Sequence, residues 1–258
     1  MIKMKQEKRL QWLIEYLLQE NEDYRKIPSS EYERKQLLRA LMNVRMPNGI
    51  DEKFLEIQDE YLSEELSKKT IASLKNISPV DEHIYLWKGD ITTLEVDAIV
   101  NAANSSLLGC FVPGHACIDN AIHSAAGVQL RLACDEIITK QGKKEPTGTS
   151  KITFAYNLPC RYVIHTVGPI IQNEVTKREC DLLESCYMSC LNLAADHDVK
   201  SIALCCISTG EFHFPNELAA EIAVHSVKKF LNNHKMDVIF NVFKEVDYDI
   251  YRRLLNTN

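Results

Sequence analysis

Three side chains that commonly bind transition metals lie close together in one short segment of the chain. Cys110, His115 and Cys117 all fall within the stretch GCFVPGHACIDNAIH, which starts at Gly109. Thiolates and imidazoles are preferred zinc ligands, and a site with three protein ligands keeps a fourth tetrahedral position open for chemistry. Because a free cysteine also serves as a small buried hydrophobe, the spacing alone leaves both a metal site and plain packing open.

Two further segments carry polar residues directly after apolar runs. Asn101 and Asn104 follow the run VDAIV, and the segment STGEFHFP, which starts at Ser208, follows SIALCCI. A Ser-Thr-Gly turn between a strand and a helix can present a row of backbone N–H groups to a phosphate. Such turns and asparagines are also common in loops without a ligand, so a phosphate site and a plain turn both remain open.

Short β-rich runs alternate with helical patterns over most of the chain, which predicts an α/β layered domain. Several runs, IALCCI most clearly, are apolar throughout, as expected for interior strands of a mostly parallel sheet. Ligands of such sheets bind beyond the carboxyl ends of the strands, where both polar segments would lie. The predicted strands are 84–91, 96–103, 151–156, 162–168, 201–208 and 238–243, and the predicted helices are 118–137, 180–197 and 216–233.

The N-terminal part of the chain is rich in Glu, Lys, Arg and Leu and has no plausible strand before about residue 75. Leucines recur at helical spacing from Leu10 to Leu18, and Ser30 can cap a second helix. Two more helices are predicted over 51–66 and 67–74. We therefore predict a helical extension over residues 1–78 and a main domain over residues 79–258. The extension could stabilise the main domain, dock a partner or gate the substrate.

Charge and hydropathy argue against several classes of function. The formal net charge is -6 and the basic residues are dispersed, so nucleic acid is not an expected partner. No segment has the roughly 20 apolar residues of a membrane-spanning helix, and the N-terminal segment does not resemble a secretory signal. We expect a cytoplasmic protein whose cysteines act as thiols or ligands rather than in disulfides. Core packing is the expected role of Cys134, Cys160, Cys180, Cys186, Cys190, Cys205 and Cys206.

Several motifs, in order along the chain, together resemble the macrodomain family. They are GDIT from Gly89, VDAIVNAANSSLLG from Val96, Asp119 with the segment 122–127, YVIHTVGP from Tyr162, and the ISTG…FP loop from Ile207. The resemblance covers residues 86–251. It implies a three-layer α/β/α sandwich with a mixed, mostly parallel central sheet, preceded here by the helical extension. Macrodomains bind ADP-ribose, and many hydrolyse it from modified proteins.

The resemblance also implies roles for single residues. Asp119 would lie at the reactive side of the distal ribose and, with Asn104, would be catalytic. His123 and His165 match family positions that are more often structural than catalytic. The implied substrate-binding residues are Asp90 and Ile91 at the adenine amino group, Phe243 against the adenine ring, Ser208, Thr209, Gly210 and Glu211 around the diphosphate, Phe212 and Asn104 at the distal ribose, and Asn101.

The opening loop departs from the commoner macrodomain pattern, which has a run of glycines at this point. It is similar to the zinc-containing branch of the family, whose ligands would fall on Cys110, His115 and Cys117. This resemblance implies one catalytic Zn²⁺, which would hold a ribose hydroxyl or a water. Asp119 would orient the attacking water or accept its proton, and an Asp or Glu ester is the expected linkage. Glu211 departs from the usual hydrophobic residue, so its carboxylate must point away from the phosphates or meet a cation.

The zinc branch implies particular partners as well. Its members are associated with a sirtuin-like ADP-ribosyltransferase and, in bacteria, with a lipoylated carrier protein that resembles the glycine-cleavage H protein. The substrate would then be an ADP-ribosylated carrier, and the helical extension is where that carrier could dock. Three alternatives stay open: a reader that binds ADP-ribose without hydrolysing it, a phosphatase acting on ADP-ribose 1″-phosphate, and an unrelated α/β protein with a structural zinc.

Overall fold

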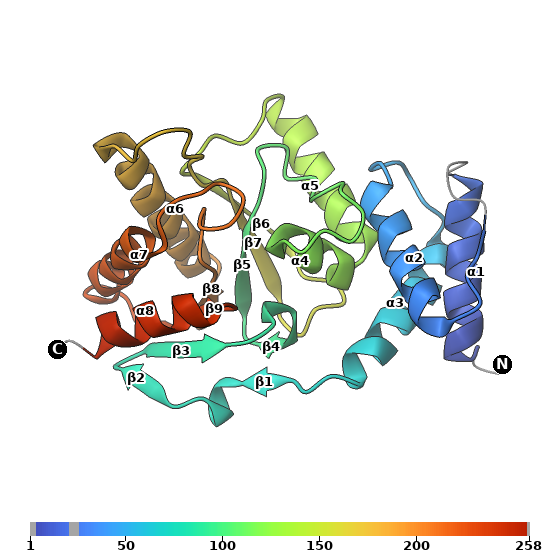
Figure 1. The fold of residues 1–258 in the computed structure, drawn as a ribbon, viewed down its shortest axis with the longest axis horizontal. Helices are drawn as coiled ribbons and strands as arrows, with labels where there is room; N and C mark the ends of the chain where they lie inside the picture. Colours follow the sequence, from blue (N-terminus) through green and yellow to red (C-terminus); the bar gives the residue numbers. More distant parts are fainter. Residues whose placement is uncertain (1–3, 21–25, 257–258) are drawn as a thin grey trace.

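The computed structural model describes residues 4–20 and 26–256, which form a central sheet with flanking helices and a group of N-terminal helices (Figure 1). The seven strands of the sheet are β2 (Pro79–Asp81), β3 (Ile84–Lys88), β5 (Ala98–Ala102), β6 (Ser150–Phe154), β7 (Tyr162–Thr166), β8 (Ser201–Leu204) and β9 (Asp237–Val242). They pair in the order β2-β3-β9-β8-β5-β7-β6. The pairs from β3 to β7 are parallel, whereas β2 and β6 join the two edges in antiparallel orientation.

Helices cover both faces of this sheet and complete three layers (Figure 1). On one side lie α4 (Ile118–Ala126) and α5 (Val128–Gln141), and on the other lie α6 (Lys177–Asp196), α7 (Asn216–Leu231) and α8 (Glu245–Leu255). The apolar faces of these helices and the interior strands share one continuous core. The predicted α/β/α sandwich with a mixed, mostly parallel sheet and an N-terminal helical segment is therefore confirmed.

The predicted single helix over 118–137 is wrong because the chain breaks at Gly127. Its φ angle of 96° ends α4, and α5 starts at the next residue. A Cβ atom at Gly127 would lie 2.6 Å from side-chain atoms of Gln58 and Gln129, so this break also allows a close approach of the N-terminal helices.

The predicted helix over 67–74 is also wrong, as is the absence of a strand before residue 75. Helix α3 (Glu52–Ser67) ends where that helix was expected to begin. Strand β1 (Ala72–Ser73) instead pairs in parallel with β4 (Leu94–Glu95), and a 3-10 turn over Leu74–Asn76 follows. Pairing with a strand twenty residues away is a tertiary contact, which overrides local helix propensity.

Several predicted strands end earlier than expected, and some short strands and the last helix were not predicted. Strand β3 ends at Lys88, and Asp90 caps a 3-10 turn over Ile91–Thr93 by accepting a hydrogen bond from the Thr92 N–H. Strand β8 likewise ends at Leu204, before the CCIS segment. Strand β2 and helix α8 had no predicted counterpart.

The N-terminal helices have a hydrophobic core of their own. Helices α1 (Gln6–Gln19), α2 (Glu31–Val44) and α3 pack together, with Leu13, Ile14 and Phe54 fully buried between them. Val128 of α5 joins this cluster, so the extension rests directly on the main domain. The division at residue 78 stays a prediction. No helix within residues 4–20 and 26–256 is long and apolar enough to cross a membrane.

The cysteines outside the loop mostly fill the core, as expected for small buried hydrophobes. Cys186 and Cys190 share one face of α6 and are completely buried, and Cys134 and Cys205 are also buried. Cys160, Cys180 and Cys206 are partly exposed, and all nine cysteines are free.

Candidate active site

Two loops at the carboxyl ends of neighbouring strands form the candidate site. Strands β5 and β8 pair directly, so the loops after them, residues 103–117 and 205–215, leave the sheet side by side (Figure 1). This is where open α/β sheets bind ligands. The structure therefore brings the two polar segments together at one edge of the sheet.

The carboxylate of Asp119 lies at the bottom of the first loop, in the first turn of α4. Its side chain is only 6 % exposed. The Asn101 side-chain amide donates to Oδ1 at 2.8 Å, and the Asn104 amide donates to Oδ2 at 3.3 Å. Burial raises the pKa of Asp119 to about 6, although both amides and the Arg131 charge lower it. The structure thus brings Asn101, Asn104 and Asp119 together around one carboxylate.

Two buried histidines lie behind this carboxylate. His165 Nδ1 is 3.2 Å from the Asn101 amide nitrogen, and its Nε2 is 3.0 Å from the Thr153 hydroxyl. His123 Nε2 lies 3.5 Å from Asp119 Oδ1. Burial lowers the pKa of His165 to about 3 and that of His123 well below its usual value. Both rings are therefore neutral, and His165 keeps the Asn101 amide in position.

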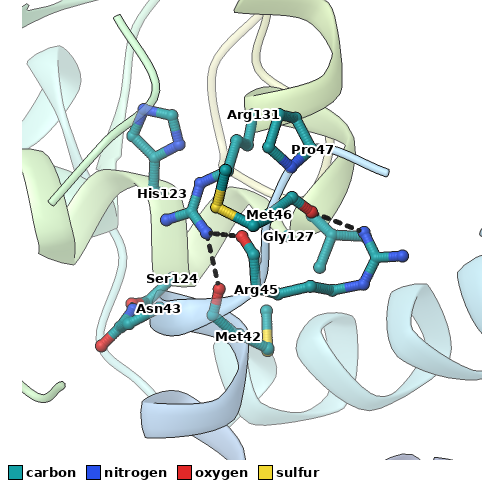
Figure 2. Close-up of a pocket in the computed structure, with 10 residues that line it drawn as sticks. Met42, Asn43, Arg45, Met46, Pro47, His123, Ser124, Gly127 and Arg131 are labelled. Carbon is teal, nitrogen blue, oxygen red and sulfur yellow. Dashed lines mark hydrogen bonds between the residues drawn. The ribbon is translucent and has the colours of Figure 1, made fainter. Parts of the chain in front are cut away.

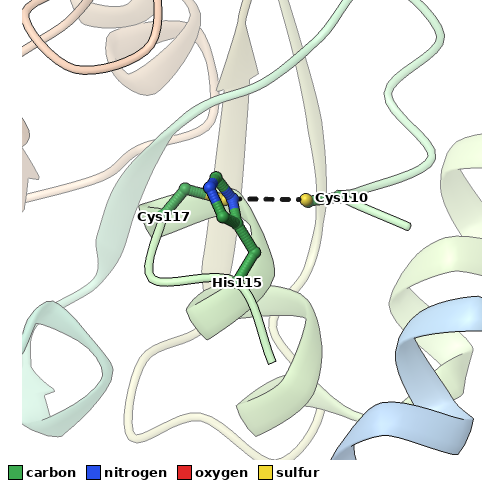
Figure 3. Close-up of side chains that lie close together, drawn as sticks. All are labelled: Cys110, His115 and Cys117. Carbon is green, nitrogen blue, oxygen red and sulfur yellow. Dashed lines mark hydrogen bonds between the residues drawn. The ribbon is translucent and has the colours of Figure 1, made fainter. Parts of the chain in front are cut away.

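The three expected metal ligands converge in the same loop. The ligand atoms of Cys110, His115 and Cys117 all lie within 4.8 Å of one another. Cys110 Sγ is 3.5 Å from His115 Nδ1, and Figure 3 shows this sulfur facing the imidazole ring. Ligand atoms of a tetrahedral zinc site lie about 3.5–3.8 Å apart. The donor types and this distance therefore fit a single tetrahedral ion.

Cys117 has a second role as the N-cap of α4. Its Sγ accepts a hydrogen bond from the Asn120 N–H at 3.4 Å. Burial raises the pKa of its thiol to about 11, so the protein alone favours the protonated form and a cation would be needed to hold a thiolate.

A second group of possible metal ligands consists of His123, Cys134 and His165, whose ligand atoms are also within 4.8 Å of one another. All three are buried. Both ring nitrogens of His165 already have partners in Asn101 and Thr153, and Cys134 Sγ lies 3.7 Å from Nε2. This group therefore forms part of the packing behind Asp119 rather than an open site.

The second loop has the backbone geometry expected of a phosphate site. Ser208 adopts a φ angle of 65°, and its carbonyl accepts a hydrogen bond from the Phe214 N–H at 2.9 Å, which closes the loop. Within the part of the chain that the structure describes, the backbone N–H groups of Ser208, Gly210, Glu211 and Phe212 donate to no other group. Such a row of free donors is suited to an anion.

The Glu211 side chain lies beside His115, one of the candidate metal ligands. Its Oε1 is 3.7 Å from His115 Nε2, and the side chain is 71 % exposed. The sequence predicts that this carboxylate points away from the phosphates or meets a cation. In the structure the carboxylate lies beside a candidate metal ligand, where a bound cation would be close to it.

The residues expected to hold adenine lie together at the other end of the site. Gly89 N–H donates to the Val242 carbonyl at 3.0 Å, which brings Asp90 next to Phe243. The Phe243 ring is 76 % exposed and Asp90 Oδ2 is 3.5 Å from Lys69 Nζ. Three strand spacings, about 14 Å, separate β3 from β5 in the sheet order. The arrangement therefore suits an elongated ligand that crosses several strands.

The first loop, residues 103–117, carries the candidate metal ligands and is called the metal-ligand loop below. The sequence did not indicate three residues that support it. Arg131 of α5 donates to the Leu108 carbonyl at 2.6 Å and also to the Met42 and Arg45 carbonyls at the end of α2 (Figure 2). The other two, Arg39 and Asn43, come from α2 itself. A lone arginine on the apolar face QLRLAC was the only available signal for Arg131, and nothing local marks the other two.

Comparisons with known proteins agree with this geometry. The macro domain family profile matches residues 100–223. A protein called protein-ADP-ribose hydrolase from Treponema medium is 56 % identical over 98 % of this chain and all of its own length. A protein of the same name from Staphylococcus aureus (strain MSSA476) is 47 % identical over 96 % of this chain and 95 % of its own length.

Solved structures show the same fold. The Trypanosoma brucei macrodomain in complex with ADP-ribose superposes with a TM-score of 0.67 and 31 % identity, covering 84 % of this chain and 95 % of that one. The Oceanobacillus iheyensis macrodomain with ADP gives 0.61 and 39 % identity over 67 % and 89 % of the two chains. The chain belongs to the macrodomain family.

Proposed function

We propose that this protein is an ADP-ribosylhydrolase that removes mono-ADP-ribose from modified protein side chains. The observation that carries the proposal is the buried Asp119 carboxylate, which two asparagine amides hold in the first turn of α4, directly after the metal-ligand loop. The name protein-ADP-ribose hydrolase of relatives that match nearly the full chain supports the same activity.

The ligand would cross the carboxyl edge of the sheet in one direction. Adenine would lie between Asp90 and Phe243, and the free N–H groups of Ser208 and residues 210–212 would receive the diphosphate. The distal ribose would then reach Asn104 and Asp119 in the first loop. This order follows the strand order β3-β9-β8-β5, because each part of the ligand meets the loop of the next strand.

We further propose that Cys110, His115 and Cys117 hold a zinc ion beside the distal ribose, because their donor types and spacing fit a three-ligand site. When bound, zinc supplies a Lewis acid that polarises a ribose hydroxyl or a water. Glu211 would lie against the outer nitrogen of His115 and hold the ring in place. Cys117 would fix the metal relative to α4, because it also caps that helix.

Asp119 would orient the attacking water and accept its proton. Hydrolysis breaks the bond between C1″ of the ribose and the acceptor oxygen and adds the hydroxyl of the water to C1″, so one water proton passes to Asp119 while an Asp or Glu acceptor leaves as a carboxylate. Asn101 and Asn104 donate to the two oxygens of the carboxylate and so hold it in a fixed orientation. The bond that is cut would be an ester of an Asp or Glu side chain. The substrate would be a cytoplasmic protein, such as a lipoylated carrier that a sirtuin-like ADP-ribosyltransferase has modified.

The test is release of free ADP-ribose from an Asp/Glu-linked, mono-ADP-ribosylated protein. We expect release by the zinc-loaded protein, loss of release in a chelated sample that is checked for folding, and a loss of at least about 100-fold in Asp119→Asn. Asp181→Asn is the matched control, because this exposed carboxylate pairs only with Lys177 on the surface of α6. Binding of ADP-ribose without any release would instead identify a reader, and phosphate release from ADP-ribose 1″-phosphate alone would identify a phosphatase.

A further inference from the structure

Helix α2 of the N-terminal extension contacts the metal-ligand loop through an arginine. The Arg39 guanidinium donates to the His115 carbonyl at 3.2 Å and to the Asn120 side-chain oxygen at 2.7 and 3.1 Å. These contacts join residues more than seventy positions apart in the sequence. One side chain therefore ties a ligand-bearing residue to the first turn of α4.

Asn43, one turn further along α2, holds the preceding residue of the loop. Its side-chain oxygen accepts a hydrogen bond from the Gly114 N–H at 2.9 Å, and its amide donates to the Ser124 hydroxyl at 2.9 Å. The Asn43 side chain is nearly fully buried at 1 % exposure. Gly114 has a φ angle of 64°, so the loop turns sharply at the residue whose N–H bonds to Asn43 of α2.

Asn120 connects Arg39 to a second candidate ligand, Cys117. Its side-chain amide donates to the Val112 carbonyl at 3.1 Å, and its backbone N–H donates to Cys117 Sγ at 3.4 Å. Its side-chain oxygen is the one that receives Arg39. Between Cys110 and Cys117, all of which the structure describes, the backbone forms one hydrogen bond within the segment, from the His115 N–H to the Val112 carbonyl. Its shape therefore depends mainly on groups outside it.

Arg131 secures the opposite side of the same loop. Besides its bonds to the Leu108 carbonyl and to the end of α2, its guanidinium lies 4.4 Å from the centre of the Phe111 ring. Only 5 % of the arginine is exposed. The segment from Leu108 to Asn120 is thus held between α2 and α5.

We propose that the N-terminal helices are part of the metal site, with Arg39 and Asn43 as positioning residues that preset the spacing of Cys110, His115 and Cys117. This inference rests on the proposed zinc site. Groups that orient metal ligands typically change metal affinity by about 10–100-fold when they are removed, because the ligands must then be ordered at the moment of binding. The extension therefore does more than stabilise the fold.

The test compares zinc dissociation constants of full-length variants by chelator competition. We expect Arg39→Ala to weaken zinc binding by about 10–100-fold, with a smaller loss in Arg39→Lys, which keeps one donor. The Co²⁺-loaded variant should also lose the visible absorption of a tetrahedral thiolate site. Arg34→Ala is the matched control, because it removes an arginine of the same helix that pairs with Glu7 instead, and it should leave zinc affinity unchanged.

Amide hydrogen exchange of residues 110–117 in the metal-free protein gives a second readout, and Arg39→Ala should speed it up. If Arg39→Ala fails to fold, Asn43→Ala answers the same question, because it removes the acceptor of the Gly114 N–H; it too should weaken zinc binding and speed up exchange. A folded Arg39→Ala protein with wild-type zinc affinity and wild-type exchange overturns the proposal. Absence of zinc binding in the wild-type protein would refute the metal site itself, whereas the exchange comparison would still report whether α2 orders the loop.

Discussion

At the scale of single residues, the burial of His165 behind the Asp119 carboxylate predicts a loss of stability in acid. Burial lowers the pKa of His165 to about 3, from a usual value near 6.5. The folded state therefore keeps this ring neutral, while the unfolded chain binds a proton below about pH 6.5. The resulting stability is fully present above that pH and is lost as the pH falls toward 3.

We expect the free energy of unfolding to fall by about 2–3 kcal/mol between pH 7 and pH 4.5 through His165 alone. Urea unfolding at a series of pH values measures this. A His165→Gln variant should be less stable at neutral pH but should show a shallower decline. His225→Gln, which removes an exposed histidine of α7, should keep the wild-type slope. Equal slopes in both variants would contradict the prediction.

Glu211 provides a second prediction at this scale. Its carboxylate lies 3.7 Å from the outer nitrogen of His115, and carboxylates in this position orient metal-bound imidazoles. We expect Glu211→Ala to weaken zinc binding by about tenfold, as measured by chelator competition. Glu174→Ala removes an exposed loop glutamate far along the sequence from both loops and should have no effect. A zinc affinity equal to that of the wild type would show that the carboxylate does not support His115.

At the scale of secondary-structure elements, the sequence predicted the helices and strands that a local apolar pattern defines. The apolar faces of α6 and α7 and the core run of β5 lie where they were expected, because side-chain burial follows the helical or strand repeat. The helix expected over 67–74 failed because its residues pair with β4, a partner that no local pattern reveals. The roles of Arg39 and Asn43 were not predicted for the same reason, because their contacts join α2 to a loop more than seventy residues away.

The turn after β8 depends on a close approach to the strand-end residue Gly168. A Cβ atom there would lie 2.0 Å from Ser208 Oγ and 2.8 Å from Ile207 Cγ2. We expect Gly168→Ala to push the second loop outward, to cost about 1–3 kcal/mol of stability, and to weaken ADP-ribose binding in calorimetry. Gly49→Ala is the control, because nothing lies within 4 Å of its Cβ position. Unchanged ADP-ribose affinity in Gly168→Ala would mean that the diphosphate is not bound by this loop.

At the scale of the whole molecule, the extension and the main domain share buried polar contacts as well as apolar ones. Gln58 of α3 is fully buried, and its side-chain oxygen accepts a hydrogen bond from the Val128 N–H, at the first residue of α5, at 3.0 Å. Helix α5 has no side-chain cap of its own. The extension therefore satisfies a backbone donor of the main domain, and breaking the contact leaves that donor buried without a partner.

These contacts predict that the chain unfolds as one cooperative unit rather than as two domains. The two tryptophans report on the two parts separately, since Trp12 lies in α1 and Trp87 lies in β3. We expect Trp12→Phe and Trp87→Phe proteins to show the same urea midpoint by fluorescence. Gln58→Ala should lower both midpoints by an amount equivalent to about 1–3 kcal/mol, whereas Gln36→Ala on the exposed face of α2 should not. Loss of the Trp12 signal at a lower urea concentration would instead make the extension an independent domain, and a metal loop held by α2 would then loosen before the sheet unfolds.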